Sequence, residues 1–211
     1  MMNERVVEAE ILDGLPADDP EAARSRRDLR RLNAVMGNHR WLRGKLRAGE
    51  RVVEIGAGEG DLARRFAAGG VGVTGLDLVG EPAGLPEGVA WVSGDCFETL
   101  GTVSGDVIVG CLVLHHFEGG ALRRLGELIE AGEYGRVLAT EPYRAWWAMG
   151  EGAVVTPFVN RVTRHDMFVS IRAGFRGGEL GFALGMDSSK WDVWESVTIF
   201  GAYRFEAVRK G

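Results

Sequence analysis

Short apolar runs alternate with amphipathic stretches through the middle of the chain. Runs such as RVVEI (51–55) and GRVLAT (135–140) have the length of buried strands, whereas ALRRLGELIEA (121–131) repeats its apolar positions at helical spacing. The pattern predicts five strands, and these fall in residues 51–56, 71–80, 89–97, 105–117 and 135–143. Because such strands alternate with helices in βαβ units, we expect a mainly parallel sheet with helices on both faces.

A helical segment precedes this region. Asp19 and Pro20 are typical of a helix start, and Gly37 is typical of a helix end. An apolar stripe runs along the otherwise basic segment between them, and it comprises Leu29, Leu32, Val35 and Met36. We therefore expect an N-terminal helical extension in residues 1–48 and the main α/β domain in residues 49–211.

The C-terminal end of the chain is β-rich. Two strand-like runs within residues 191–210 are separated by Gly201, which predicts a hairpin at the edge of the parallel sheet. A hairpin at that edge can also pair between subunits, so a homodimer is one expectation.

Composition is that of an ordinary globular domain. The chain has 211 residues, 45% of them apolar and 26% charged. No apolar run approaches the roughly 18 residues of a membrane span, and the N-terminus lacks the apolar segment of a secretion signal. We therefore expect a cytoplasmic protein without membrane contact, in which Cys96 and Cys111 are free, buried thiols.

Positive charge is concentrated near the N-terminus. The net charge is −5, yet residues 21–51 hold ten Lys and Arg against three acids, a local excess of +7. Such an excess is compatible with nucleic-acid binding. The apolar stripe in the same segment and the acidic remainder of the chain favour an amphipathic helix that covers a pocket, and nucleic acid is not the expected partner.

Glycine recurs at every second position after the first strand, at Gly56, Gly58 and Gly60. Glycines at a strand-to-helix turn let the backbone approach a ligand closely. The dinucleotide fingerprint would require glycine at position 61, where Asp61 stands, and a phosphate-binding loop would require a following lysine. By itself the loop does not identify its ligand.

Acids follow the next two predicted strands. Asp77 ends the second strand, where a carboxylate can bind both hydroxyls of a ribose, and Asp95 ends the third, where one can accept from an exocyclic amine. The far end of the fourth strand carries His115 and His116. The carboxyl ends of parallel strands meet at one edge of a sheet, and we expect a ligand there.

These features together resemble the class I S-adenosylmethionine (SAM) dependent methyltransferases. The segment from Glu54 to Gly60 matches that family's E/D-x-G-x-G-x-G, Asp77 its ribose-binding acid and Asp95 its adenine-side acid. The resemblance covers about residues 45–211. It implies an α/β, Rossmann-like, seven-stranded and mostly parallel sheet with an antiparallel C-terminal hairpin, with SAM as cofactor. The cofactor-binding residues that it implies are Glu54, Gly56, Ala57, Gly58, Asp77, Leu78, Asp95, Cys96, Cys111 and Leu112.

The residues after the fourth strand exclude several subclasses. The [DNS]-P-P-[YFW] segment of amino-methylating DNA and RNA enzymes is absent. Cys111 follows glycine rather than the proline of cytosine-C5 enzymes, so we interpret it as a packing residue and not a nucleophile. The chain then resembles the small-molecule O-, N- or C-methyltransferases, with an aromatic or polyketide-like acceptor of secondary metabolism. Two alternatives stay open: an RNA or protein methyltransferase that uses the basic helix, and a SAM-binding module without turnover.

Three features are candidates for the acceptor side. His115 or His116 is the predicted general base; the alternative is that both pack against the sheet edge. Because the two residues are adjacent in sequence, their side chains should project in different directions and chelate a metal poorly, so no metal is predicted. Glu141 and Tyr143 follow the fifth strand, where Glu141 can orient a substrate or cap a helix. The polar segment 160–167 predicts a substrate pocket or, equally, a capping network, and its candidate substrate residues are Arg164 and His165.

Overall fold

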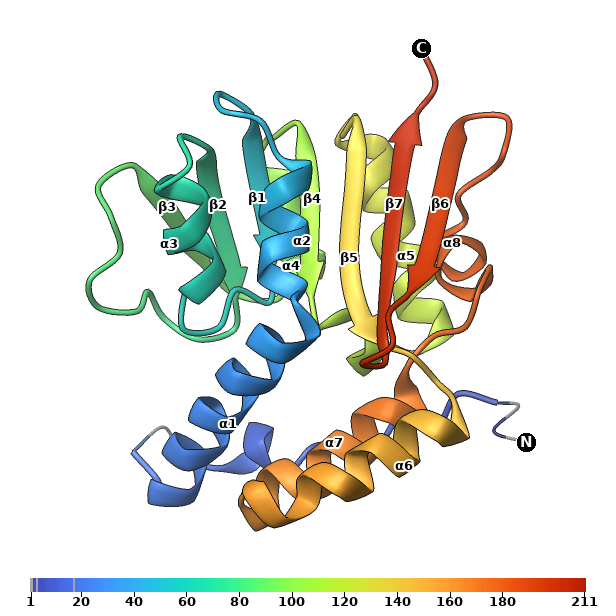
Figure 1. Ribbon diagram of the computed structural model, residues 1–211. Helices are drawn as coiled ribbons and strands as arrows, with labels where there is room; N and C mark the ends of the chain where they lie inside the picture. Colours follow the sequence, from blue (N-terminus) through green and yellow to red (C-terminus); the bar gives the residue numbers. More distant parts are fainter. Residues whose placement is uncertain (1, 3, 17) are drawn as a thin grey trace.

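Seven strands form a single sheet with the order β3-β2-β1-β4-β5-β7-β6 in the computed structural model, which describes residues 2, 4–16 and 18–211 (Figure 1). Strands β1 to β5 are parallel, and β7 runs antiparallel to both β5 and β6. The predicted fold class and C-terminal hairpin are therefore confirmed. The strands are β1 (Arg51–Ile55), β2 (Gly72–Asp77), β3 (Val89–Ser93), β4 (Val107–Cys111), β5 (Arg136–Pro142), β6 (Trp191–Val197) and β7 (Ala202–Arg209).

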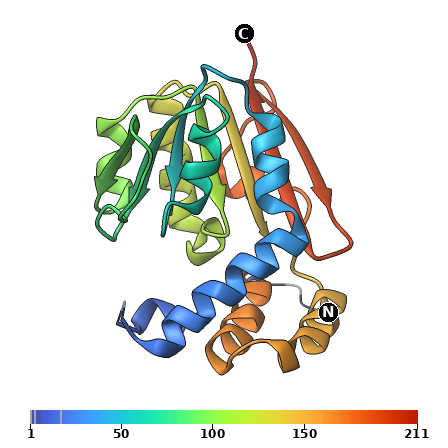
Figure 2. The same ribbon diagram turned by 60° about the vertical axis from the view of Figure 1, so that its left-hand side comes forward.

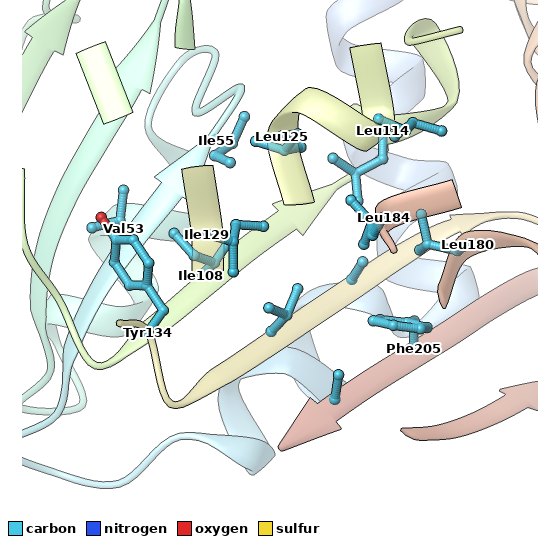
Figure 3. Packing of buried hydrophobic residues seen from close by; sticks show 14 of the residues in the cluster. Val53, Ile55, Ile108, Leu114, Leu125, Ile129, Tyr134, Leu180, Leu184 and Phe205 are labelled. Carbon is cyan, nitrogen blue, oxygen red and sulfur yellow. The ribbon is translucent and has the colours of Figure 1, made fainter. Parts of the chain in front are cut away.

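Helices pack on both faces of this sheet. One face carries α2 and α3, whose Leu42 and Phe66 are fully buried against β1 and β4. The other face carries α5 and α8, which bury Leu125 and Leu184 (Figure 3). The helices are α1 (Pro20–Met36), α2 (Asn38–Lys45), α3 (Asp61–Ala67), α4 (Cys96–Thr99), α5 (Gly119–Ala131), α6 (Trp146–Val155), α7 (Arg161–Ala173) and α8 (Glu179–Leu184).

A third layer lies beyond the carboxyl ends of the parallel strands, where α1, α6 and α7 gather (Figures 1 and 2). Helix α1 starts and ends as predicted, because the Asp19 carboxylate accepts from the Glu21 and Ala22 amides and Gly37 adopts a φ of +69°. Helix α2, although within the predicted extension, belongs to the sheet's own packing. Within the predicted extension, the segment before α2 lies over the sheet edge, together with α6 and α7 (Figures 1 and 2).

Three predicted strands were too long: β2 ends at Asp77 rather than at residue 80, and β3 and β4 each end before a turn. Strand β4 ends at Cys111, since Leu112 adopts a left-handed φ of +55° and a 3-10 turn follows at Leu114–His116. Strand β3 ends at Ser93, and the Asp95 side chain then caps α4 by accepting from the Phe97 amide at 2.9 Å. In both places a turn redirects the chain where the strand meets the ligand edge.

Two further expectations concern the chain as a whole. No helix among residues 2, 4–16 and 18–211 is long and apolar enough to cross a membrane. Cys96 and Cys111 are both free, as predicted, and each is half-buried.

Candidate active site

A cavity of about 620 Å³ lies between the carboxyl edge of the sheet and the third layer. Its floor is the glycine loop and the segment after β4, and its walls come from α1, α6 and α7. The apolar stripe predicted on α1 faces this cavity, and Val35 is 61% exposed. The side of α1 that is buried is instead the one that packs on α7, where the Ser25 and Thr163 hydroxyls lie 2.8 Å apart.

The glycine loop forms the cofactor end of the floor. Gly56, Gly58 and Gly60 all have positive φ values, from +56° to +72°. A side chain on Gly56 would place Cβ 2.4 Å from Val113, whereas Gly58 has no described atom within 4 Å of the position of its missing Cβ. Gly56 is therefore required for packing, and Gly58 leaves open space that a ligand can approach.

Glu54, the last polar residue of β1, is buried and lines the cavity. Burial raises the pKa of its carboxyl to about 8, with a smaller contribution from the charges of Asp77 and Asp61. Its Oε2 has no hydrogen-bond partner among the described residues. A cationic group in the cavity would satisfy this carboxylate.

The predicted ribose and adenine residues lie beside the cavity, on a shelf at the ends of β2 and β3. Asp77 accepts from the Gly58 amide at 2.7 Å and from the Val79 amide at 2.9 Å, so it ties β2 to the glycine loop. Leu78 is 78% exposed, and Asp95 is exposed as well. The structure thus places both acids at one edge, next to an uncovered apolar side chain.

The cavity floor continues through Cys111 and Leu112. The Leu112 amide donates to the Thr140 carbonyl at 2.8 Å, which holds its left-handed conformation. A non-glycine residue in this region costs about 1–3 kcal/mol and is typical of functional sites. Burial raises the pKa of the Cys111 thiol to about 12 and that of Cys96 to about 11, which fits packing rather than nucleophilic roles.

Glu141 lies buried beneath the turn that follows β4. Its carboxylate accepts from the amides of Val113, Leu114 and His115 at 2.9 to 3.3 Å. The same carboxylate lies 2.6 Å from Nδ1 of His115. Glu141 therefore fixes the turn and the orientation of the His115 ring from below, and it caps this turn rather than a following helix.

The N-terminal segment reaches this turn from the other side. Glu10 Oε1 lies 3.5 Å from His115 Nε2, and Asp13 Oδ2 lies 3.7 Å from His116 Nδ1. Arg5 donates to the backbone carbonyls of His115 and Phe117 at 3.1 Å. Sequence reasoning missed these contacts because an isolated acid in an N-terminal segment carries no local signal of a partner about 100 residues away.

His115 and His116 both line the cavity. Their ring centroids lie 4.3 Å apart, so the prediction that the two would project in different directions was wrong; the 3-10 turn brings the rings together. Burial lowers the pKa of His115, but the carboxylates of Glu10 and Glu141 outweigh it and raise the pKa to about 9. Burial, and then the charge of His115, lower the pKa of His116.

The other predicted substrate residues lie outside this cavity. Tyr143 borders a separate hollow with Trp147, and Arg164 and His165 are exposed on α7. Within the 160–167 segment, Asn160 caps α7 by accepting from the Thr163 amide at 2.8 Å. The buried Asp166 accepts from the amides of Ile11 and Leu12. The polar side chains of this segment therefore cap α7 and hold the N-terminal segment against it.

Two arginines of the basic helix α1 form ion pairs with an acid of the glycine loop. Arg26 and Arg30 line the cavity and pair with Glu59, and Arg30 also lies 3.9 Å from Asp61. These pairs join the third layer to the cofactor end of the floor. Exposed pairs of this kind contribute about 0–1 kcal/mol each.

Solved structures of methyltransferases have the same fold. The plantazolicin methyltransferase BamL, in complex with a triazolic desmethylPZN analog and SAH, has a TM-score of 0.72 at 12% identity, over 94% of this chain and 92% of its own. The pyocyanin biosynthetic protein PhzM has a TM-score of 0.62 at 19% identity, over 92% of this chain and 60% of its own. Human N-acetylserotonin methyltransferase, in complex with SAM, also has a TM-score of 0.62 at 19% identity, over 94% of this chain and 61% of its own.

These likenesses confirm the predicted Rossmann-like methyltransferase fold. No family model matches the chain, and no curated protein matches it in sequence.

Proposed function

We propose that the chain is a SAM-dependent methyltransferase that acts on a small, largely apolar acceptor of aromatic or polyketide type. The observation that carries this proposal is the single cavity that joins the glycine loop, through Leu112, to the histidine pair. A cofactor at one end and an acceptor at the other would meet inside it. Structures of the same fold bound to SAM or SAH support the choice of cofactor.

The cofactor end suits SAM better than a nucleotide phosphate. SAM carries a sulfonium and an α-ammonium. The Glu54 carboxylate, whose Oε2 has no hydrogen-bond partner in the described part of the chain, would offset this positive charge. Gly58 would allow close approach of the methionine part. Asp77 and Asp95, on the adjoining shelf, would bind the ribose hydroxyls and the adenine amine.

The acceptor end is largely apolar, with Glu10 and Ser170 beside its two histidines. Side chains from three helices of the third layer form its walls, and they include Leu29, Leu32, Val35, Val155, Met167 and Ile171. Such walls would exclude water and hold a flat apolar molecule, while polar groups converge at one end. That end is the His115–His116 turn, where the acceptor's heteroatom would lie.

Methyl transfer is an in-line displacement. A lone pair of the acceptor attacks the methyl carbon, the carbon–sulfur bond breaks, and its electron pair stays on sulfur as the neutral thioether. The protein has to align the two molecules and assist loss of the acceptor's proton. His115 and His116 would activate the acceptor, and without a bound ion the acceptor's proton would pass to His116, the more exposed of the two.

Cofactor binding is tested by calorimetric titration of SAM and SAH. We expect Asp77→Ala to weaken both ligands while the matched change Asp106→Asn, at the opposite end of the sheet beside Arg51, leaves them unchanged. Equal affinity of wild type and Asp77→Ala would refute the cofactor assignment. Labelled SAM incubated with a metabolite extract then tests turnover; binding without labelled product would favour a module without catalysis.

The nucleic-acid alternative is tested on α1. Arg27 and Arg31 are exposed and lie outside the cavity, unlike Arg26 and Arg30. Charge reversal at Arg27 and Arg31 should leave methylation of a small acceptor intact. Loss of activity, together with salt-sensitive RNA binding by the wild type alone, would support the alternative.

A further inference from the structure

Three potential metal ligands meet at the acceptor end of the cavity: Glu10, His115 and His116. One ligand atom from each lies within 4.8 Å of the other two. We propose that these residues bind a divalent transition-metal ion of the Zn²⁺ type, and that the histidine pair activates the acceptor through this ion. The role toward the acceptor rests on the proposed function, whereas binding of the ion does not.

His115 has the hydrogen bonding of a metal ligand. Its Nδ1 lies 2.6 Å from Glu141, whose carboxylate is itself fixed by three backbone amides. Metal-ligating histidines commonly use their other ring nitrogen in this way, because a carboxylate there fixes the ring and its tautomer. The opposite nitrogen, Nε2, is buried and makes no hydrogen bond within the described part of the chain.

The spacing between Glu10 and His115 suits an ion between them. Their nearest atoms are 3.5 Å apart, longer than the usual 2.7–3.2 Å of an N–H···O bond. Two ligands about 2.0–2.2 Å from a tetrahedral Zn²⁺ lie about 3.4 Å from each other. Ser170 donates its hydroxyl to Glu10 and thereby holds this carboxylate in place.

His116 completes a set of two histidines and one carboxylate. Its ring lies 4.3 Å from that of His115, and Asp13 is 3.7 Å from its Nδ1. Three protein ligands with a further position open to a cavity are typical of catalytic rather than structural metal sites. All three residues line the cavity, so that open position would face the acceptor.

The ion would supply the activation that methyl transfer requires. A hydroxyl of the acceptor bound to the ion would become more acidic and would release its proton to solvent as the acceptor binds. The oxygen lone pair then attacks the methyl carbon of SAM as the carbon–sulfur bond breaks toward sulfur. The ion keeps its oxidation state, so no oxidant or reductant is needed.

The test uses the untagged full-length protein, stripped with a chelator and titrated with Co²⁺ in the absence of SAM. We expect one Co²⁺ per chain with visible absorption bands of a four- or five-coordinate nitrogen and oxygen site, displaced by Zn²⁺. Glu10→Gln and His116→Ala should each abolish these bands. Ser170→Ala, which removes the support of Glu10, should weaken Co²⁺ by about 10-fold.

A matched variant tests whether the loss of Co²⁺ binding is specific to the proposed ligands. Glu8→Gln changes an exposed acid on the same segment that pairs with half-buried Arg172, and it should bind Co²⁺ as the wild type does. Absence of Co²⁺ bands in the wild type, or equal bands in Glu10→Gln, would overturn the proposal and leave a proton between Glu10 and His115. Full methyl transfer by the stripped protein would overturn the role of the ion toward the acceptor. Failure of SAM to bind would refute the proposed function instead, since the Co²⁺ bands are recorded without it.

Discussion

The raised pKa of the Glu54 carboxyl predicts that the protein releases a proton when it binds SAM. With a pKa of about 8, its carboxyl is mostly protonated at pH 7, in the fraction 10/11, or about 0.9. A bound sulfonium and α-ammonium would stabilise the carboxylate and lower its pKa to the ordinary range. The carboxyl would then lose about 0.9 proton per SAM at pH 7.

The cofactor's own amine makes a small opposing contribution. An α-amino group with a pKa near 7.8 is about 0.1 deprotonated at pH 7 and would take up that amount on binding as ammonium. The expected net release by the wild type is therefore about 0.8 proton. Glu54→Gln has no carboxyl to titrate and should take up about 0.1 proton instead.

Calorimetry in buffers of different ionisation enthalpy measures this number directly. The slope of the observed binding enthalpy against the buffer's ionisation enthalpy gives the protons exchanged. Phosphate and Tris at pH 7 provide a wide range, and the difference between wild type and Glu54→Gln isolates this one group. Equal slopes for the two proteins would show that Glu54 is already ionised without ligand or does not respond to the cofactor, and would refute the reasoning.

Two further predictions concern packing and thiol reactivity. In Gly126→Ala the new Cβ would lie 1.7 Å from the Leu184 carbonyl oxygen and push α8 away from α5, which should destabilise the fold by about 1–3 kcal/mol. Gly150→Ala, in open space on α6, should instead stabilise it by up to about 1 kcal/mol. Urea denaturation measures both variants, and equal midpoints would contradict the close contact at Gly126. The raised pKa values of Cys96 and Cys111, about 11 and about 12, predict slow alkylation by iodoacetamide at pH 8 in the folded protein and fast alkylation in urea. Mass spectrometry follows both rates, and equal rates would contradict burial as the cause.

Much of the fold could be predicted because its signals are local. Apolar runs, helical spacing and the glycines after β1 each act within about a dozen residues, and they identified the βαβ units, the C-terminal hairpin and the ligand edge. The cap at Asp19 and the stop at Gly37 are equally local. Strand ends were less accurate, since the turn at Leu112 depends on its bond to Thr140 from the neighbouring strand.

The site depends on contacts that no local pattern specifies. The sequence determined which edge of the sheet binds a ligand, because parallel strands bring Gly58 and Asp77 there whatever packs above them. Only the tertiary structure decided that Glu10 meets His115, that the two histidine rings face each other, and that the stripe of α1 lines a cavity rather than the core. The physical reason is that burial and charge pairing join residues far apart in the chain, and these interactions exist only once the layers have packed.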